Sequence, residues 1–399
     1  MSNYKSITVI VGDYPAPGHM MLVFVQQLVH AIIEQGVRVS VIAPQSLLHA
    51  LMHGEKILPR RAVAKTETGW EYDIFRPYTL SFGNVRSLRR LSEWCGKHAI
   101  VSILKKVDVE VLYAHFWSNA LPVYEYAITH HKPLFVACGE GDNALEEMIK
   151  SIPSDRRNRL AKAVTGVVSV SSENMRKCVR YGLADEKIIE VIPNCVNTSV
   201  FHKMEVGETK KKLGIKDGDF VISFVGGFIH RKGPDRIAQA IRILNDPHIK
   251  VMFIGKPFPG YSYDFDCPGI IFKGSLDHDL IPQYVNCSDV FVMPTQKEGC
   301  CNAVVEALAM GVPVISSNRP FNEDILNDKN SILVDPDDVG AIAEAIKTLK
   351  DNVELRKSMS EYSLSRHEEY SITGRAKRIL SFIDRCCTRK SRHGGVEKD

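Results

Sequence analysis

Short apolar runs alternate with helical stretches along this chain, beginning with the β-branched run Ile7 to Val11. A turn follows, and then a helix to Gln35 whose apolar residues recur on one face until Gly36 ends it. Val37 to Ala43 is the next apolar run. A strand, a helix and a second strand in this order predict a parallel sheet with helices packed on it.

The same alternation continues in two blocks, with a boundary near residues 195–217. In the first block, further strands are predicted at 71–76, 109–115, 134–138, 166–170 and 188–192. In the second block, strands are predicted at 220–225, 250–254, 270–272, 290–293 and 312–315, with helices at 234–244, 280–285 and 335–349. The pattern therefore predicts an α/β chain with two doubly wound, Rossmann-like domains.

The most informative stretch is 290–318, which is predicted to form a strand, a loop, a helix and another strand. Glu298 precedes the helix and Glu306 lies within it. The backbone N–H groups of Cys301, Asn302 and Ala303 at the helix start favour a phosphate. Carboxylates instead accept hydrogen bonds from hydroxyl groups. Phosphate beside hydroxyls is the chemistry of a nucleotide sugar, although a solvated loop acid and a surface helix acid would give the same spacing.

This stretch resembles the Glu-x7-Glu signature of retaining GT-B glycosyltransferases, glycosyltransferase family four, with Cys300 and Cys301 in place of the usual Phe-Pro. The segment Ile192-Pro193-Asn194-Cys195-Val196-Asn197 is similar to the family's interdomain turn. The resemblance implies two Rossmann-like domains facing a central cleft: 1–195, an acceptor domain completed by a C-terminal helix at about 372–386, and 196–371, a donor domain. Residues 387–399 are expected to form a polar tail.

A glycine turn with two cations follows the first strand of the second domain. Gly226 and Gly227 leave the strand, and Arg231 and Lys232 come just before a helix. Cations are unfavourable at a helix N-terminus unless an anion binds there too. The turn resembles the family's Val-Gly-Arg/Asn-x-x-x-x-Lys-Gly stretch, which implies that Lys232 neutralises the leaving diphosphate. Gly227 replaces the usual Arg, and Arg231 either supplies that charge or is a solvated cation.

The resemblance also implies the rest of the donor site. Gly255, Lys256, Gly274 and Leu276 lie where the family holds the nucleotide base, Glu306 would hold the ribose, and Glu298 would hold the transferred sugar. The full donor-binding set is Glu306, Gly226, Gly227, Gly299, Cys301, Asn302, Ala303, Gly255, Lys256, Gly274 and Leu276, with Lys232, Glu298 and Arg231 as catalytic residues.

In the first domain, the turn from Gly12 to His19, which includes Gly18, matches the family's loop after strand one and is expected to line the cleft. Every Rossmann-like domain needs a tight turn there, so the glycines also fit a structural role. His115 resembles a histidine of the family's His-Ala-His segment, and a core position fits it equally well. Glu140 and Asp142 follow a strand where the family often carries a second histidine, absent here; they could orient acceptor or sugar hydroxyls or be ordinary loop acids.

Composition narrows the class of protein. The chain has 399 residues, 44% hydrophobic and 25% charged, with a net charge of +4, which favours a soluble globular protein and no nucleic-acid partner. Ten cysteines without a Cys-x-x-Cys pair fit neither a zinc site nor a disulfide framework, so we expect a reducing cytoplasm. No signal peptide is recognised, and polar residues interrupt the early apolar run Met20 to Ile33, so any membrane contact is expected to be peripheral.

A cluster of basic residues lies on a predicted pair of amphipathic helices and could bind an anionic membrane surface. Its cations include Arg86, Arg89, Arg90 and Lys97. A solvated helix face packed on the core would give the same pattern.

The predicted function is transfer of a hexosyl or N-acetylhexosaminyl group from a nucleotide-diphosphate sugar to a glycan or lipid-linked hydroxyl acceptor. The resemblance implies retained anomeric configuration, no metal and no cofactor, and a role in cell-envelope or capsular polysaccharide synthesis. One alternative is a weakly active or non-catalytic protein that binds a nucleotide sugar, suggested by Gly227 and the missing histidine. A pyridoxal-dependent GT-B phosphorylase is disfavoured, because such enzymes are much longer.

Overall fold

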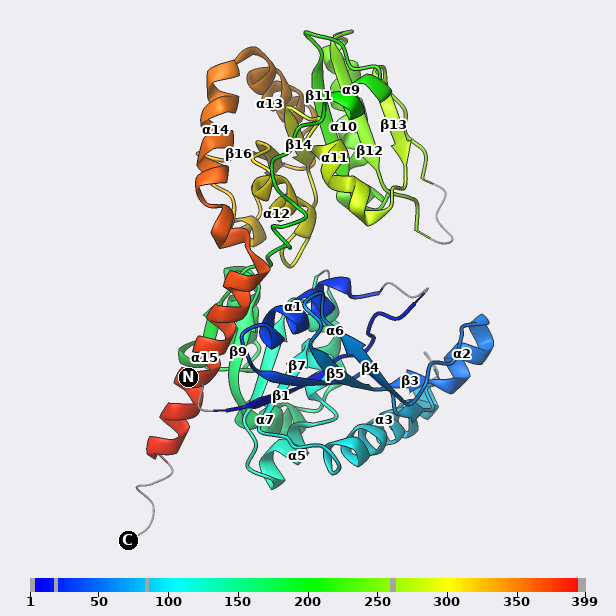
Figure 1. Ribbon diagram of the computed structural model, residues 1–399, viewed down its shortest axis with the longest axis vertical. Coiled ribbons are helices and arrows are strands. Elements are labelled where there is room, and N and C mark those ends of the chain that lie inside the picture. Colours follow the sequence, from blue (N-terminus) through cyan, green and yellow to red (C-terminus); the bar gives the residue numbers. More distant parts are fainter. Residues whose placement is uncertain (1–3, 18–20, 83–85, 142, 259–262, 394–399) are drawn as a thin grey trace. The chain divides into compact units, whose positions relative to one another are not determined.

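The structure, a computed structural model, describes residues 4–17, 21–82, 86–141, 143–258 and 263–393. The chain forms two units (Figure 1). Unit 1 comprises residues 1–192 and 375–399, and unit 2 comprises residues 193–374. Gly18, His19 and Asp142 lie outside the described residues.

Unit 1 is built on an eight-stranded sheet in the order β10-β9-β8-β7-β1-β2-β5-β4, in which only β4 runs antiparallel to its neighbour. Its strands are β1 (Ser6–Ile10), β2 (Arg38–Ile42), β4 (Arg61–Lys65), β5 (Glu71–Phe75), β7 (Val111–His115), β8 (Leu134–Cys138), β9 (Val164–Ser169) and β10 (Ile189–Val191). All the predicted apolar runs of the first block fall in this sheet. β4 was not predicted, because at the edge of the sheet none of its residues is buried and its apolar pattern is weak.

Helices cover this sheet, and a short two-stranded sheet joins β3 (Gln45–Ser46) to β6 (Tyr78–Thr79). The helices are α1 (Val23–Ile33), α2 (Leu47–His53), α3 (Arg89–Leu104), α4 (Trp117–Ala120), α5 (Tyr124–Thr129), α6 (Ala144–Ser151), α7 (Ser154–Ala163) and α8 (Ser172–Arg180). The central strands are buried along their whole length, as parallel strands covered on both faces should be.

The last helix, α15 (Ile372–His393), begins at the end of unit 2 and then packs on unit 1, beside β9 (Figure 1). The ring of Phe382 meets Phe135 edge to face, with 5.9 Å between centroids. Gly166 lies against both rings, and a Cβ there would come within 2.7 Å of Phe135. The Tyr4 hydroxyl donates to the Leu380 carbonyl at 3.2 Å, which ties the helix to the N-terminal strand region.

Unit 2 contains a fully parallel six-stranded sheet in the order β13-β12-β11-β14-β15-β16. Its strands are β11 (Phe220–Val225), β12 (Ile249–Ile254), β13 (Ile270–Gly274), β14 (Val290–Met293), β15 (Val314–Ser317) and β16 (Ser331–Val334), and its helices are α9 (Gly207–Lys212), α10 (Pro234–Leu244), α11 (Ile281–Val285), α12 (Asn302–Ala309), α13 (Val339–Asp351) and α14 (Val353–Ser365). The short edge strand β16 was not predicted. Both units are therefore Rossmann-like α/β folds, as expected from the sequence.

Among the described residues, none of the helices combines the length and the apolar character that crossing a lipid bilayer requires.

Candidate active site

The loops that carry the predicted donor residues all leave the carboxyl edge of the unit 2 sheet. β13, β12, β11 and β14 are consecutive neighbours in this sheet, so their loops lie side by side. In open parallel sheets, ligands bind at this edge. Each strand leads to one predicted residue: β13 ends at Gly274, β12 is followed by Gly255, β11 is followed by Gly226, and the loop after β14 contains Glu298.

One carboxylate oxygen of Glu298 contacts three donor groups. Its Oε1 lies 2.5 Å from the Lys232 Nζ and 3.1 Å from the Arg231 Nη1, and it accepts a hydrogen bond from the Thr295 hydroxyl at 3.0 Å. Among the described residues, no group bonds to its Oε2. The structure therefore brings the three predicted catalytic residues, Lys232, Arg231 and Glu298, into direct contact and leaves one carboxylate oxygen for a ligand.

Lys232 stays a cation in this setting. Burial by itself lowers the pKa of Lys232, but the Cys301 sulfur and the Glu298 carboxylate outweigh it, so the pKa rises above the usual lysine value. Gly233, with φ +81°, ends the short 3-10 turn His230–Lys232 and starts α10, which fixes the position of the ammonium. A Cβ at Gly233 would lie 2.8 Å from Pro294.

α12 begins directly beside this charged cluster. Cys301 precedes its first residue, and no side chain caps the helix. The N–H groups of Asn302 and Ala303 in its first turn have no partner among the described residues. The Cys301 thiol is buried, which raises its pKa to about 11, and Lys232, Glu298 and Glu306 all act on that pKa by their charge. These side chains therefore surround the start of α12.

Glu306 is half-buried in the second turn of α12. Burial raises the pKa of Glu306 to about 7, and no ion pair or hydrogen bond to its carboxyl group is present in the described part of the chain. A carboxyl group without a protein partner costs free energy unless a ligand hydroxyl or its own proton compensates.

A cavity of about 440 Å³ lies next to this cluster, over β11, β12 and β13. Five predicted residues line it: Gly226, Gly227, Gly255, Lys256 and Leu276. Gly274 lies beside the cavity, and its carbonyl accepts a hydrogen bond from the Gly255 N–H at 2.8 Å. A Cβ on Gly255 would come within 1.9 Å of the Gly226 carbonyl oxygen, so only glycine lets the two loops meet.

The two glycines of the turn after β11 differ in their hydrogen bonding. The Gly226 N–H donates to the Ile254 carbonyl at 2.9 Å, whereas the Gly227 N–H has no partner among the described residues. A Cβ on Gly227 would lie 2.6 Å from the ring of Phe258. Phe258 therefore occupies the space into which a side chain at position 227 would begin to extend.

Sequence reasoning missed two residues of this region. Phe258 is 51% exposed and lines the cavity, so its ring can stack on a flat ligand. The Asn194 side chain donates to the Asn302 Oδ1 at 2.9 Å and to the Cys300 carbonyl at 3.3 Å. Asn194 thereby holds the start of α12. The sequence offered one signal for Asn194, its place in the segment 192–197 that resembles the family's interdomain turn.

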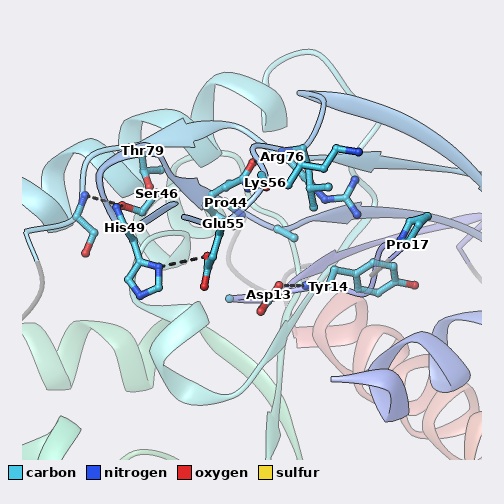
Figure 2. A pocket seen from close by; sticks show the side chains of 15 residues that line it. Asp13, Tyr14, Pro17, Pro44, Ser46, His49, Glu55, Lys56, Arg76 and Thr79 are labelled. Carbon is cyan, nitrogen blue, oxygen red and sulfur yellow. Dashed lines mark hydrogen bonds and ion pairs between the residues drawn. The ribbon is translucent and has the colours of Figure 1, made fainter. Parts of the chain in front are cut away.

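Gly12 lies in a separate cavity of about 540 Å³ in unit 1, at the carboxyl ends of β1, β2 and β5 (Figure 2). Asp13, Tyr14, Lys56 and Arg76 also line it. Asp13 and Tyr14 belong to the predicted turn from Gly12 to His19, whereas Lys56 and Arg76 were not predicted to line a site. The turn after β1 thus lines a cavity of unit 1, and its contact with a ligand stays a prediction.

His115 and Glu140 take buried positions in unit 1. His115 is 5% exposed between Phe24 and Phe116, and burial together with the charge of Arg375 lowers its pKa to about 3. His115 is thus buried as the core alternative expects, although its Nδ1 has no hydrogen-bond partner among the described residues. The Glu140 Oε1 accepts a hydrogen bond from the Trp117 N–H at 2.6 Å, and burial raises the pKa of Glu140 to about 7. Glu140 thus holds the first residue of α4.

The predicted basic surface lies partly on α3. Arg90 is exposed, and so are Leu91 (44%) and Trp94 (57%), whereas Lys97 is ion-paired with Glu125. The side chains of Arg86 and Arg89 lie outside what the structure describes.

Two families match the chain, one in each half. Residues 21–200 match the family described as "Glycosyltransferase Family 4", and residues 205–366 match the family described as "Glycosyl transferases group 1".

Two curated relatives are similar over about half of the chain. A UDP-Gal:alpha-D-GlcNAc-diphosphoundecaprenol alpha-1,3-galactosyltransferase of Escherichia coli is 28% identical over 48% of this chain and 53% of its own length. The capsular polysaccharide biosynthesis glycosyltransferase CapM of Staphylococcus aureus is 27% identical over 51% of this chain and 57% of its own length. The chain thus spans little more than half the length of these two relatives.

Solved structures share the fold over almost the whole chain. A sucrose-phosphate synthase from Thermosynechococcus elongatus superposes with a TM-score of 0.75 at 16% identity, covering 96% of this chain and 100% of that one. HepE of Anabaena, solved in complex with UDP-glucose, has a TM-score of 0.70 at 13% identity, covering 95% of this chain and 99% of that one.

Proposed function

We propose that this chain is a GT-B glycosyltransferase, because residues 21–200 and 205–366 match glycosyltransferase families and its fold is that of GT-B structures. In this proposal it transfers a sugar from a nucleotide-diphosphate sugar to a hydroxyl acceptor. The observation that carries this proposal is the contact of Lys232 and Arg231 with Glu298, beside a cavity bounded by Gly226 and Gly255. Two cations and one carboxylate meet there, next to backbone N–H groups that have no partner in the described part of the chain. Such a set suits a diphosphate with a sugar attached to it.

The nucleotide would lie along the carboxyl edge of the unit 2 sheet. Its base would enter the 440 Å³ cavity against Phe258 and Leu276, a volume in the range of small-molecule sites. Its diphosphate would bind the Gly227 N–H, the first turn of α12 and the two cations. Its ribose hydroxyls would bond to the unpartnered carboxyl group of Glu306. The names of the Escherichia coli relative and of the Anabaena complex both contain UDP, which supports a UDP-sugar donor.

Catalysis in this arrangement is electrostatic. As the bond from the sugar to the diphosphate breaks, negative charge grows on the leaving phosphate. Lys232 and Arg231 would stabilise this charge. The Glu298 Oε2 would orient the hydroxyls of the transferred sugar. We propose that configuration is retained, with the leaving phosphate taking the acceptor proton, and that the two cations serve in place of a metal.

The acceptor is proposed to be a glycan, free or carried on a lipid, in cell-envelope or capsular polysaccharide synthesis at the cytoplasmic side of the membrane. The names of the two curated relatives support this class. Exposed Arg90, Leu91 and Trp94 on α3 would let unit 1 rest on anionic lipid. Sedimentation with vesicles, with and without anionic lipid and at two salt concentrations, tests this contact; equal binding to both vesicles would contradict it.

The second candidate is a protein that binds a nucleotide sugar without turnover. The observation in its favour is Gly227, where Phe258 fills the space of the arginine usual in the family. One experiment separates the two. Thermal shifts with UDP-, GDP- and ADP-sugars identify the donor, because a ligand of the native state raises Tm, and release of the nucleotide diphosphate is then followed over time. Binding without release would support the second candidate, and no shift with any donor would contradict both.

A further inference from the structure

Arg236 is a buried arginine of unit 2, close to the turn that carries Arg231 and Lys232. It lies in the first turn of α10 and is 3% exposed. Among the residues that the structure describes, no carboxylate comes within ion-pair distance of its guanidinium, and the neighbouring Asp235 places its Oδ2 2.9 Å from the His230 Nδ1 instead. A cation is unfavourable both in the interior and at a helix N-terminus, so an apolar side chain would pack there at lower cost.

The guanidinium of Arg236 joins two loops through their backbone carbonyls. Its Nη1 donates to the His230 carbonyl at 2.8 Å, and its Nη2 donates to the Pro294 carbonyl at 2.8 Å. His230 begins the 3-10 turn that ends at Lys232, and Pro294 directly follows β14 and begins the loop that contains Glu298. One planar group therefore spans the two segments whose side chains meet in the contact of Lys232 with Glu298.

The packing around the guanidinium fixes its position. A Cβ at Gly233 would lie 2.8 Å from the Arg236 Nη2 and 2.8 Å from the Pro294 Cγ, so the guanidinium lies directly against this glycine and this proline. The carbonyls before and after Pro294 accept hydrogen bonds from the Ser316 and Ser317 hydroxyls of β15, at 2.9 and 2.5 Å. The loop after β14 is therefore held by β15 on one side and by Arg236 of α10 on the other.

We propose that Arg236 is a positioning residue for the proposed transfer, and that it sets the separation of Lys232 and Glu298. The proposal rests on the proposed function, because these two groups are the ones that would act on the donor. An arginine suits this task better than a lysine, since its planar fork donates to two carbonyls in different directions at once. Misplacement of a group at a reaction centre by about 1 Å can cost about 100-fold in rate, so a link of this kind bears directly on turnover.

The loss of Arg236 should loosen the two loops without separating them. A backbone hydrogen bond from the Gln296 N–H to the Arg231 carbonyl, 2.9 Å long, remains when the guanidinium is removed. We therefore expect Arg236→Met to lower kcat about tenfold, less than the limit given above, with a much smaller change of KM for the donor.

A double-mutant cycle tests whether Arg236 acts through Lys232. The proteins are the wild type, Arg236→Met, Lys232→Met, the double variant and the control Arg242→Met, an exposed arginine of the same helix. If Arg236→Met does not fold, Arg236→Gln, which keeps an N–H donor, replaces it throughout. The substrate is whichever of UDP-, GDP- and ADP-glucose the wild type hydrolyses fastest, and kcat and KM are measured below the unfolding temperature of every variant.

In the Lys232→Met background we expect the substitution of Arg236 to lower kcat only about twofold or less, because the group that it positions is gone. Arg242→Met should match the wild type. A tenfold loss in both backgrounds would indicate a structural effect that does not depend on Lys232, and either this result or an unchanged kcat in the single variant would overturn the proposal. No release of nucleotide diphosphate by the wild type would instead refute the proposed function, and this proposal with it.

Discussion

The ammonium of Lys232 lies 2.5 Å from the Oε1 of Glu298, so the two charges neutralise each other when no ligand is present. A diphosphate that reaches this place must draw Lys232 away from Glu298 or share it. The carboxylate then becomes freer to accept hydrogen bonds from sugar hydroxyls. In the proposed function, the contact would therefore couple two tasks, stabilising the leaving group and holding the sugar.

Replacing Lys232 by Met removes the cation beside the leaving phosphate. We expect kcat for transfer to fall about 100-fold or more, because a preorganised charge at a developing oxyanion contributes on that order. The matched control is Lys350→Met, which removes another ion-paired lysine of unit 2, bonded to Asp246 at 2.9 Å. Initial rates of nucleotide release measure both. Equal rates for Lys232→Met and the wild type would exclude a role of Lys232 in the chemical step.

Replacing Glu298 by Gln should separate donor binding from transfer. Lys232 loses its partner and becomes available to the diphosphate, so UDP itself should bind as well as before or several-fold tighter. Transfer from the UDP-sugar should fall about 100-fold, because the orienting carboxylate is gone. Calorimetry with UDP and initial transfer rates give the two readouts, and Glu344→Gln, on the exposed face of α13, is the control. Weaker UDP binding together with normal transfer would be the opposite of this expectation.

Gly255 and Gly274 offer a matched pair for the loop contact. In Gly255→Ala the new Cβ would lie 1.9 Å from the Gly226 carbonyl oxygen, so we expect a loss of about 1–3 kcal/mol in the free energy of unfolding and much weaker nucleotide binding. In Gly274→Ala the nearest atom is 3.8 Å away, so both quantities should stay near the wild type. Denaturant unfolding and UDP titration measure them. Equal effects of the two substitutions would show that the close approach is unimportant.

Residues of the proposed donor site show how much of this structure the sequence predicts. Lys232 and Glu298 could be assigned to one site because each belongs to a motif with fixed spacing, but their direct pairing depends on how two distant loops fold. Gly255 was predicted as a donor-site residue from the family resemblance. The reason why glycine is needed there, the close approach to the Gly226 carbonyl oxygen, is visible only in the folded structure. The apolar runs located the strands of the two large sheets except for β4, an exposed edge strand with a weak apolar pattern, and β16, a short edge strand of four residues.

Phe258 and Arg76 could not be found from the sequence. Phe258 is an aromatic residue in a loop, and its place on the cavity depends on the glycine at position 227. Arg76 belongs to a predicted strand end and carries no motif. Its burial beside the unit 1 cavity is a property of the packed structure alone.

Donor affinity should depend on pH through Glu306. Burial raises the pKa of Glu306 to about 7, so the carboxyl group is largely protonated at pH 6 and largely ionised at pH 8. The ionised form accepts stronger hydrogen bonds from ribose hydroxyls, and we therefore expect the Kd for a UDP-sugar to fall several-fold between pH 6 and pH 8. Both phosphates of a UDP-sugar are esterified, so the ligand itself does not titrate in this range. In Glu306→Gln the affinity should be lower at pH 8 and independent of pH. A Kd that varies with pH to the same extent in this variant would assign the effect to another group.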